Sequence, residues 1–242
     1  MSLLPLIFSS FCTGLGALPI LLIKNVSHKG KDGLLAYTAG IMVAASTYGL
    51  IPSAMKLSNL TVLVIGIIVG TLVLTLLEGF IPHTDLDHSQ QSSPQNSKVI
   101  ILFLIAMSLH NLPEGLSVGI SNVSTVEDIG PIVSFAIGLQ NVPEGFLVAL
   151  FLVTQDVSRF KAILLAMLTG IIELCAGLIG IFFGESFEFI IPYGLAFAAG
   201  SMLFVIYKEL IPESHGDGNE RASTLAFIFG FLTMVILTEW LR

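Results

Sequence analysis

Residues 109–115 read Leu-His-Asn-Leu-Pro-Glu-Gly, and residues 139–145 read Leu-Gln-Asn-Val-Pro-Glu-Gly. Each stretch places a glutamate, directly after a proline, in the middle of a long apolar run. A charge at the centre of a bilayer is costly, so such residues face the interior of a helix bundle and usually mark the pathway of an ion or substrate. The two stretches therefore predict a helical membrane protein with a polar centre.

The rest of the chain has the composition of a membrane protein. Of its 242 residues, 54% are hydrophobic and 11% are charged, and the mean hydropathy is +0.92, whereas soluble domains carry roughly 25% charged residues. Crossing the hydrocarbon core takes about 20 apolar residues, and runs of this kind lie near 3–23, 33–56, 59–80, 98–121, 130–153, 160–184, 188–212 and 222–241. Backbone groups in lipid must be paired within the span, and no run alternates like a barrel strand. We therefore predict an all-α membrane protein of eight transmembrane helices, with residues 1–242 forming one domain.

Lysine and arginine side chains are distributed unequally between the two ends of these spans. The side with the connections after the odd-numbered spans carries Lys24, Lys29, Lys31, Lys98, Arg159, Lys161, Lys208 and Arg221, whereas the other side carries Lys56 and Arg242. Basic residues favour the cytoplasmic side of a membrane. We therefore expect both termini outside the cytoplasm and the polar connection at about 83–97 inside it. In that connection His83, Asp85, Asp87 and His88 either gather metal or form a plain polar loop.

Two internal similarities indicate an inverted repeat. The fourth and fifth spans share the stretches quoted above, and the second and seventh share residues 39–52 and 199–212, which both contain Ala-Gly, then Met, then Leu-Ile-Pro. Each pair is separated by an odd number of crossings, so its two members run in opposite directions. We expect three helices, two central helices and three more. Transporters often bind their substrate near the midplane at such a repeat interface.

Three glutamates lie about halfway through their spans: Glu114, Glu144 and Glu173. Carboxylates at one depth repel one another unless a cation or protons share the space, so a cation site is the natural interpretation. His110 and Glu114 are four residues apart and project from one face of their helix. Gln140 and Glu144 repeat that geometry in the next span.

The types of these side chains indicate which cations could bind. Imidazole and carboxylate together suit Zn²⁺, Fe²⁺, Mn²⁺ or Co²⁺, whereas an all-oxygen cage suits Mg²⁺ or Ca²⁺. Pro113 and Pro143 lack a backbone donor and so free carbonyl groups one turn earlier. The alternative is a kinked helix with a packed, protonated glutamate, and this alternative has most weight for Glu173. Glu209, Glu213 and His215 lie at the end of the seventh span, where they are equally well explained as charged side chains exposed to solvent.

The paired motifs, with eight spans and a polar loop between the third and fourth, resemble the ZIP family of zinc and iron transporters, in particular its bacterial GufA-like branch. The resemblance implies uptake of divalent metal into the cytoplasm, across a cell membrane of the bacterial inner-membrane kind, through a two-metal site at mid-membrane. It implies that Met42, His110, Glu114, Gln140 and Glu144 form the first metal site. It also implies that Asn111, Asn141 and Glu173 form the second, which shares Glu114 and Glu144.

One position departs from the family pattern. Asn141 stands where many relatives have aspartate or glutamate, and an amide brings no charge. We therefore expect one tightly bound metal near His110 and a second that is weak or absent.

Other functions remain to be weighed against metal transport between the second, fourth, fifth and sixth spans. A proton-coupled carrier of an organic solute could use the glutamates as relays. An intramembrane metalloenzyme is disfavoured because no His-Glu-x-x-His motif and no second histidine occur within the spans. We expect no enzyme activity and no cofactor, with Zn²⁺ first among the transported metals. The expected partners are metal ions and the lipid bilayer, with a homodimer as an option, while the net charge of −7 argues against nucleic acid.

Overall fold

The computed structural model describes residues 3–23, 26–79, 97–216 and 218–240, and most of these residues are helical. The helices are α1 (Leu4–Ala17), α2 (His28–Ala44), α3 (Ile51–Leu57), α4 (Leu60–Gly79), α5 (Ser97–Asn122), α6 (Ile129–Thr154), α7 (Arg159–Ser186), α8 (Ile190–Val205), α9 (Ile211–Glu213) and α10 (Glu220–Trp240). Three short helical segments link some of them: η1 (Leu18–Leu21), η2 (Ala45–Leu50) and η3 (Ile206–Leu210). The all-α prediction is confirmed. His83, Asp85, Asp87 and His88 lie outside the described residues.

Within the described ranges, eight helical units are long and apolar enough to cross a membrane, as predicted. Their bounds agree with the predicted runs to within a few residues, except that the second begins at His28 instead of residue 33. Ser27 caps this helix, because its side chain accepts a hydrogen bond from the backbone nitrogen of Gly30 at 3.2 Å. The first turn of α2 is polar, so the length of the apolar run does not show that the helix begins there.

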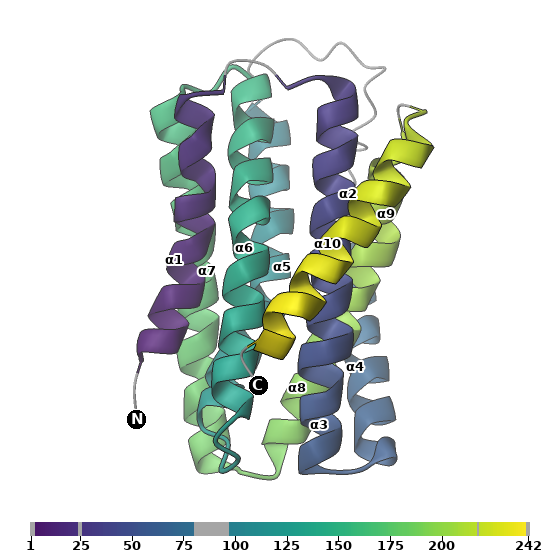
Figure 1. The fold of residues 1–242 in the computed structure, drawn as a ribbon. Helices are drawn as coiled ribbons and strands as arrows, with labels where there is room; N and C mark the ends of the chain where they lie inside the picture. The colour runs from purple at the N-terminus through teal and green to yellow at the C-terminus, as the bar shows by residue number, and fades with distance from the viewer. Residues whose placement is uncertain (1–2, 24–25, 80–96, 217, 241–242) are drawn as a thin grey trace.

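The eight units form two groups, which we call the first and second bundles. The first bundle contains α1, α5, α6 and α7, and the second contains α2–α3, α4, α8–α9 and α10. Figure 1 shows the two bundles side by side, with α10 crossing α2 obliquely. The bundles meet mainly where α5 packs against α8, and where α2 and η2 pack against α6.

Glycines let the helices within each bundle pack so closely that their backbones touch. In the first bundle, a Cβ atom added at Gly16 or Gly145 would lie 1.9 Å from a carbonyl oxygen of the facing helix, and in the second bundle one added at Gly40 would lie 2.1 Å from the carbonyl oxygen of Phe227. Small residues at helix interfaces allow this close packing in membranes. Between the bundles, a Cβ at Gly49 would instead make an ordinary contact, 3.8 Å from the Cβ of Ala136. Each bundle is therefore interlocked through its backbone, while a Cβ at Gly49 or Gly194 would meet side chains across the bundles, the second of them closely, at 2.4 Å from the Ile120 side chain.

Two π-helical turns occupy corresponding places in the second and seventh spans. The backbone nitrogen of Ile51 donates to the carbonyl of Ser46, and that of Ile211 donates to the carbonyl of Ile206. Each turn immediately precedes an Ile-Pro pair. Proline clashes with the carbonyl four residues earlier in a regular helix, and a widened turn relieves that clash. The positions match the sequence similarity of these two spans, although the pattern of apolar residues did not predict the π-helical turns.

Candidate metal site

The central site is built on α5 and α6, which both continue through their internal prolines. These helices bury Glu114, Gln140 and Glu144 within the protein, and Gln140 and Glu114 are completely buried. The Gln140 Nε2 atom donates a hydrogen bond to Glu114 Oε1 at 2.5 Å. The side chains predicted from the two motifs therefore meet across the α5–α6 contact.

A narrow pocket adjoins this pair between the two bundles. It is lined by His110, Pro113 and Glu114 of α5 from the first bundle and by Met42, Ser201, Met202 and Val205 of α2 and α8 from the second. The pocket leaves no room for a water molecule. Met42 is buried here, so the structure brings it together with His110 and Glu114, the neighbours that the family resemblance implied for it.

Several buried oxygen atoms at this place have no hydrogen-bond partner among the described residues. They are Glu114 Oε2, both carboxylate oxygens of Glu144, Gln140 Oε1 and Asn141 Oδ1. Buried polar atoms are normally paired, and an unpaired carboxylate is the most costly case. A divalent cation would supply the missing partner for these acceptors, so the donor set fits a metal ion.

The site is not yet arranged as a closed coordination sphere. Within the described ranges, no three His, Cys, Asp or Glu side chains are grouped closely enough to hold a metal ion as they stand. Glu114 is near enough to Glu144 and Glu173 to interact with them electrostatically, and Glu144 interacts in the same way with His110.

Glu173 has a different environment from the other two glutamates. Its Oε1 atom accepts a hydrogen bond from the Ser9 hydroxyl of α1, and its Oε2 atom accepts one from Asn141 Nδ2 at 2.8 Å. Asn141 Nδ2 also donates to the Ser9 carbonyl oxygen at 3.0 Å. Asn111 is buried, and its Nδ2 atom has no partner in the part of the chain that the structure describes. The structure thus joins Glu173 and Asn141 directly but gives Asn111 no hydrogen bond through its amide nitrogen.

Two residues near the site were not predicted as part of it. Ser9 lies in a span without charge or motif, and Glu209 seemed equally consistent with solvated charge. The structure places Glu209 Oε1 at 3.3 Å from His110 Nε2. Glu209 lies in the π-helical turn η3, whose extra residue changes the face on which side chains project. Regular helical spacing therefore could not assign it.

Acidic side chains continue from Glu209 toward the end of the bundles where α2 begins. Glu213 interacts electrostatically with both Glu209 and Asp32. Asp32 is buried, and its Oδ2 atom accepts a hydrogen bond from Asn219 Nδ2 at 2.9 Å. These groups connect the neighbourhood of His110 with the end of the protein that carries most of the lysine and arginine residues.

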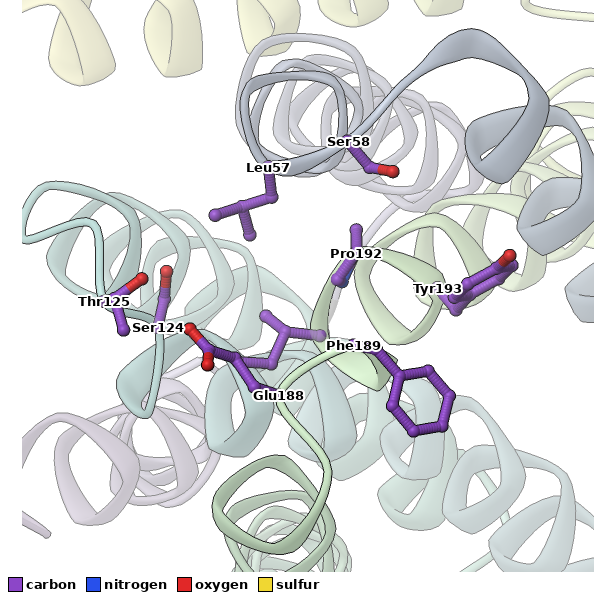
Figure 2. Close-up of a pocket in the computed structure, with 9 residues that line it drawn as sticks. Leu57, Ser58, Ser124, Thr125, Glu188, Phe189, Pro192 and Tyr193 are labelled. Carbon is purple, nitrogen blue, oxygen red and sulfur yellow. The ribbon is translucent and has the colours of Figure 1, made fainter.

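A larger pocket opens at the opposite end. It has a volume of about 490 Å³ and is lined by residues of the α3–α4, α5–α6 and α7–α8 connections and the start of α8. Figure 2 shows the Glu188 carboxylate and the hydroxyl groups of Ser124 and Thr125 together on one side of it. Near this pocket an ion pair joins the bundles, with Lys56 Nζ in the last turn of α3 at 3.6 Å from Asp128 Oδ2 in the α5–α6 connection.

Comparisons with known proteins point to one family. A family model described as ZIP Zinc transporter matches residues 77–238. The chain is 35% identical to the zinc transporter GufA of Myxococcus xanthus, over 93% of this chain and 92% of that protein. It is 33% identical to the zinc transporter ZIPB of Bordetella bronchiseptica, over 93% of this chain and 76% of that protein. It is also 27% identical to the zinc transporter ZupT of Streptococcus mutans, over 93% and 91% of the two chains.

Proposed function

The chain belongs to the ZIP family of zinc transporters, and we propose that it carries Zn²⁺ into the cytoplasm through the central site between its two bundles. It is a multi-pass membrane protein whose relatives are named as transporters, so its function is transport and not catalysis. Zinc is its substrate, not a resident cofactor. Fe²⁺, Mn²⁺ and Co²⁺ are further candidate substrates, because their ligand preferences overlap with those of zinc.

One observation carries this proposal: Glu114 Oε2 and both carboxylate oxygens of Glu144 are buried without a hydrogen-bond partner among the described residues, and Glu114 lines a pocket between the bundles together with His110. With Met42 and Gln140, they offer oxygen, nitrogen and sulfur ligands to an ion. Carboxylate and imidazole are common zinc ligands, while neutral ligands such as amide and thioether bind less tightly than a closed set of thiolates and imidazoles. A carrier needs this moderate affinity in order to release its cargo.

The ion moves when one bundle shifts against the other. In support, backbone contacts interlock the helices within each bundle, whereas the contact at Gly49 and Ala136 between bundles is an ordinary side-chain distance. Most of the proposed ligands lie on α5 and α6 of the first bundle, and Met42 lies on α2 of the second. A relative shift would therefore separate Met42 from the other ligands and loosen the site.

The direction of transport follows from the charges at the two ends. The excess of basic residues on one side favours the cytoplasm there and both termini outside. The acidic series Glu209, Glu213 and Asp32 leads toward that side and forms the exit. The pocket shown in Figure 2, with Glu188 on its wall, forms the outer mouth.

Uptake into liposomes tests the proposed function. Purified protein should bring radioactive zinc into sealed vesicles at a rate that saturates with zinc concentration. Fe²⁺, Mn²⁺ and Co²⁺ should compete with zinc, whereas Mg²⁺ and Ca²⁺ at the same concentrations should not, because they prefer all-oxygen ligands. Protein-free vesicles are the control. Equal competition by Mg²⁺ would contradict the mixed ligand set.

Zinc binding should also depend on pH. Carboxylate and imidazole bind a metal in their deprotonated forms, so metal and protons compete for the same groups and binding releases protons. The apparent dissociation constant for zinc should therefore rise as the pH falls from about 8 to about 5, a range that includes the ordinary titration of histidine. Calorimetry in buffers of different ionisation enthalpy measures both the affinity and the number of protons released. Binding that is constant over this range, with no proton release, would contradict the site.

A further inference from the structure

Three buried polar side chains from three different helices meet beside the central site. Ser9 of α1 and Glu173 of α7 are completely buried, and Asn141 of α6 is 1% exposed. Both carboxylate oxygens of Glu173 accept hydrogen bonds, one from the Ser9 hydroxyl and one from the Asn141 amide. Asn141 uses the second hydrogen of Nδ2 for the Ser9 carbonyl oxygen. We call this group the Ser9–Asn141–Glu173 clamp.

The clamp separates Glu173 from the other two central glutamates. Both oxygens of Glu144 and one oxygen of Glu114 are buried without a hydrogen-bond partner in the described ranges, whereas each oxygen of Glu173 has one. A cation removes the penalty of an unpaired buried carboxylate. A cation would therefore supply partners for Glu114 and Glu144, whereas Glu173 already has neutral donors for both of its oxygens.

Charge balance leads to the same division. Ionised Glu114 and Glu144 together neutralise one divalent ion. A second ion in the same place would bring the total charge of the cations to four, while Glu173 would add only one more negative charge. Asn141 contributes none, because its Nδ2 atom is committed to Glu173 and Ser9 and its Oδ1 atom could offer a second ion only a neutral ligand.

We propose that the central site of this protein binds a single zinc ion, and that the Ser9–Asn141–Glu173 clamp takes the place of a second one. The inference rests on the proposed function, since it concerns the number of ions at that same site. Glu173 is then a positioning residue. It ties α7 to α1 through Ser9 and to α6 through Asn141, which directly follows the proposed ligand Gln140 in the sequence. The clamp lies wholly within the first bundle, so it holds the ligand-bearing helices together during transport.

The number of bound zinc ions tests the proposal. Native mass spectrometry and equilibrium dialysis of the purified protein at micromolar zinc should give one ion per chain. Glu173→Gln should still bind one ion, because glutamine keeps the shape of glutamate and still offers an acceptor to Asn141. Asn141→Asp should bind two, because it replaces the clamp's amide donor with a carboxylate facing Glu173, and a second zinc ion can then bridge the two carboxylates.

A matched pair on α1 tests the clamp itself. Ser9→Ala removes the donor to Glu173, whereas the hydroxyl of the neighbouring buried Ser10 has no hydrogen-bond partner among the described residues. Ser9→Ala should therefore lower the midpoint of thermal unfolding in detergent, and Ser10→Ala should lower it much less, while both variants keep one zinc ion.

Two zinc ions in the parent protein that fall to one in Glu173→Gln would overturn the clamp and leave the proposed transport function standing. A parent protein that binds no zinc would overturn the proposed function instead.

Discussion

Replacing Glu144 by alanine is expected to abolish zinc uptake while the protein still inserts into the membrane. Glu144 presents both carboxylate oxygens without a hydrogen-bond partner in the described chain, so they are available to an ion. Removing this carboxylate takes away both a ligand and a negative charge, so the affinity for zinc should fall by about a hundredfold, which corresponds to roughly 2.7 kcal/mol. Glu114→Ala should have the same effect. Radioactive zinc uptake by cells that express each variant, normalised to the amount of protein in the membrane, measures it.

A suitable control removes a carboxylate far from the site. Glu185 is exposed near the end of α7 and belongs to no proposed ligand set. Glu185→Ala should transport zinc at nearly the rate of the parent protein. Normal zinc uptake by Glu144→Ala would contradict the assignment of the central site.

Joining the two bundles covalently is expected to stop transport just as completely. Gly49 lies in η2 of the second bundle, and a Cβ atom there would be 3.8 Å from the Cβ of Ala136 on α6 of the first bundle. This separation is the usual one for the Cβ atoms of a disulfide. Gly49→Cys combined with Ala136→Cys should therefore form a disulfide on oxidation, hold the bundles in one relative position and reduce zinc uptake to the background of protein-free vesicles.

Reduction provides the control for this variant. Cys12 and Cys175 are replaced by alanine beforehand, because both are free thiols. Zinc uptake should return when the disulfide is reduced, and each single cysteine variant should transport zinc under oxidising conditions. Full transport by the oxidised double variant, with the disulfide verified by mass spectrometry, would show that the bundles do not need to move at this contact.

The helical architecture could be predicted because it depends on apolar length. Each span must bury or present to lipid about 20 apolar residues, and apolar runs of this length can be recognised in the sequence. The same property explains why Glu114, Glu144 and Glu173 were recognisable, since a carboxylate inside an apolar run is rare. The structure buries all three, as expected.

The details of the site depend on interactions that apolar length and motifs do not record. Ser9 is a small polar residue in an apolar span, and such residues usually only pack between helices; its role follows from its hydrogen bond with Glu173, far away in the sequence. Glu209 faces His110 from a π-helical turn, whose extra residue breaks the regular spacing used to assign faces. Both residues therefore required the three-dimensional arrangement of the helices.

The position of bound zinc tests the central claim most directly. Crystals of the purified protein grown with zinc, measured at the zinc absorption edge, give the position of each zinc ion independently of the protein atoms. We expect one anomalous peak between the two bundles, beside α5 and α6, with carboxylate oxygens of Glu114 and Glu144 at about 2.0–2.2 Å and an imidazole nitrogen of His110 at about the same distance. Zinc found only at the ends of the bundles, with none near Glu114 and Glu144, would contradict it.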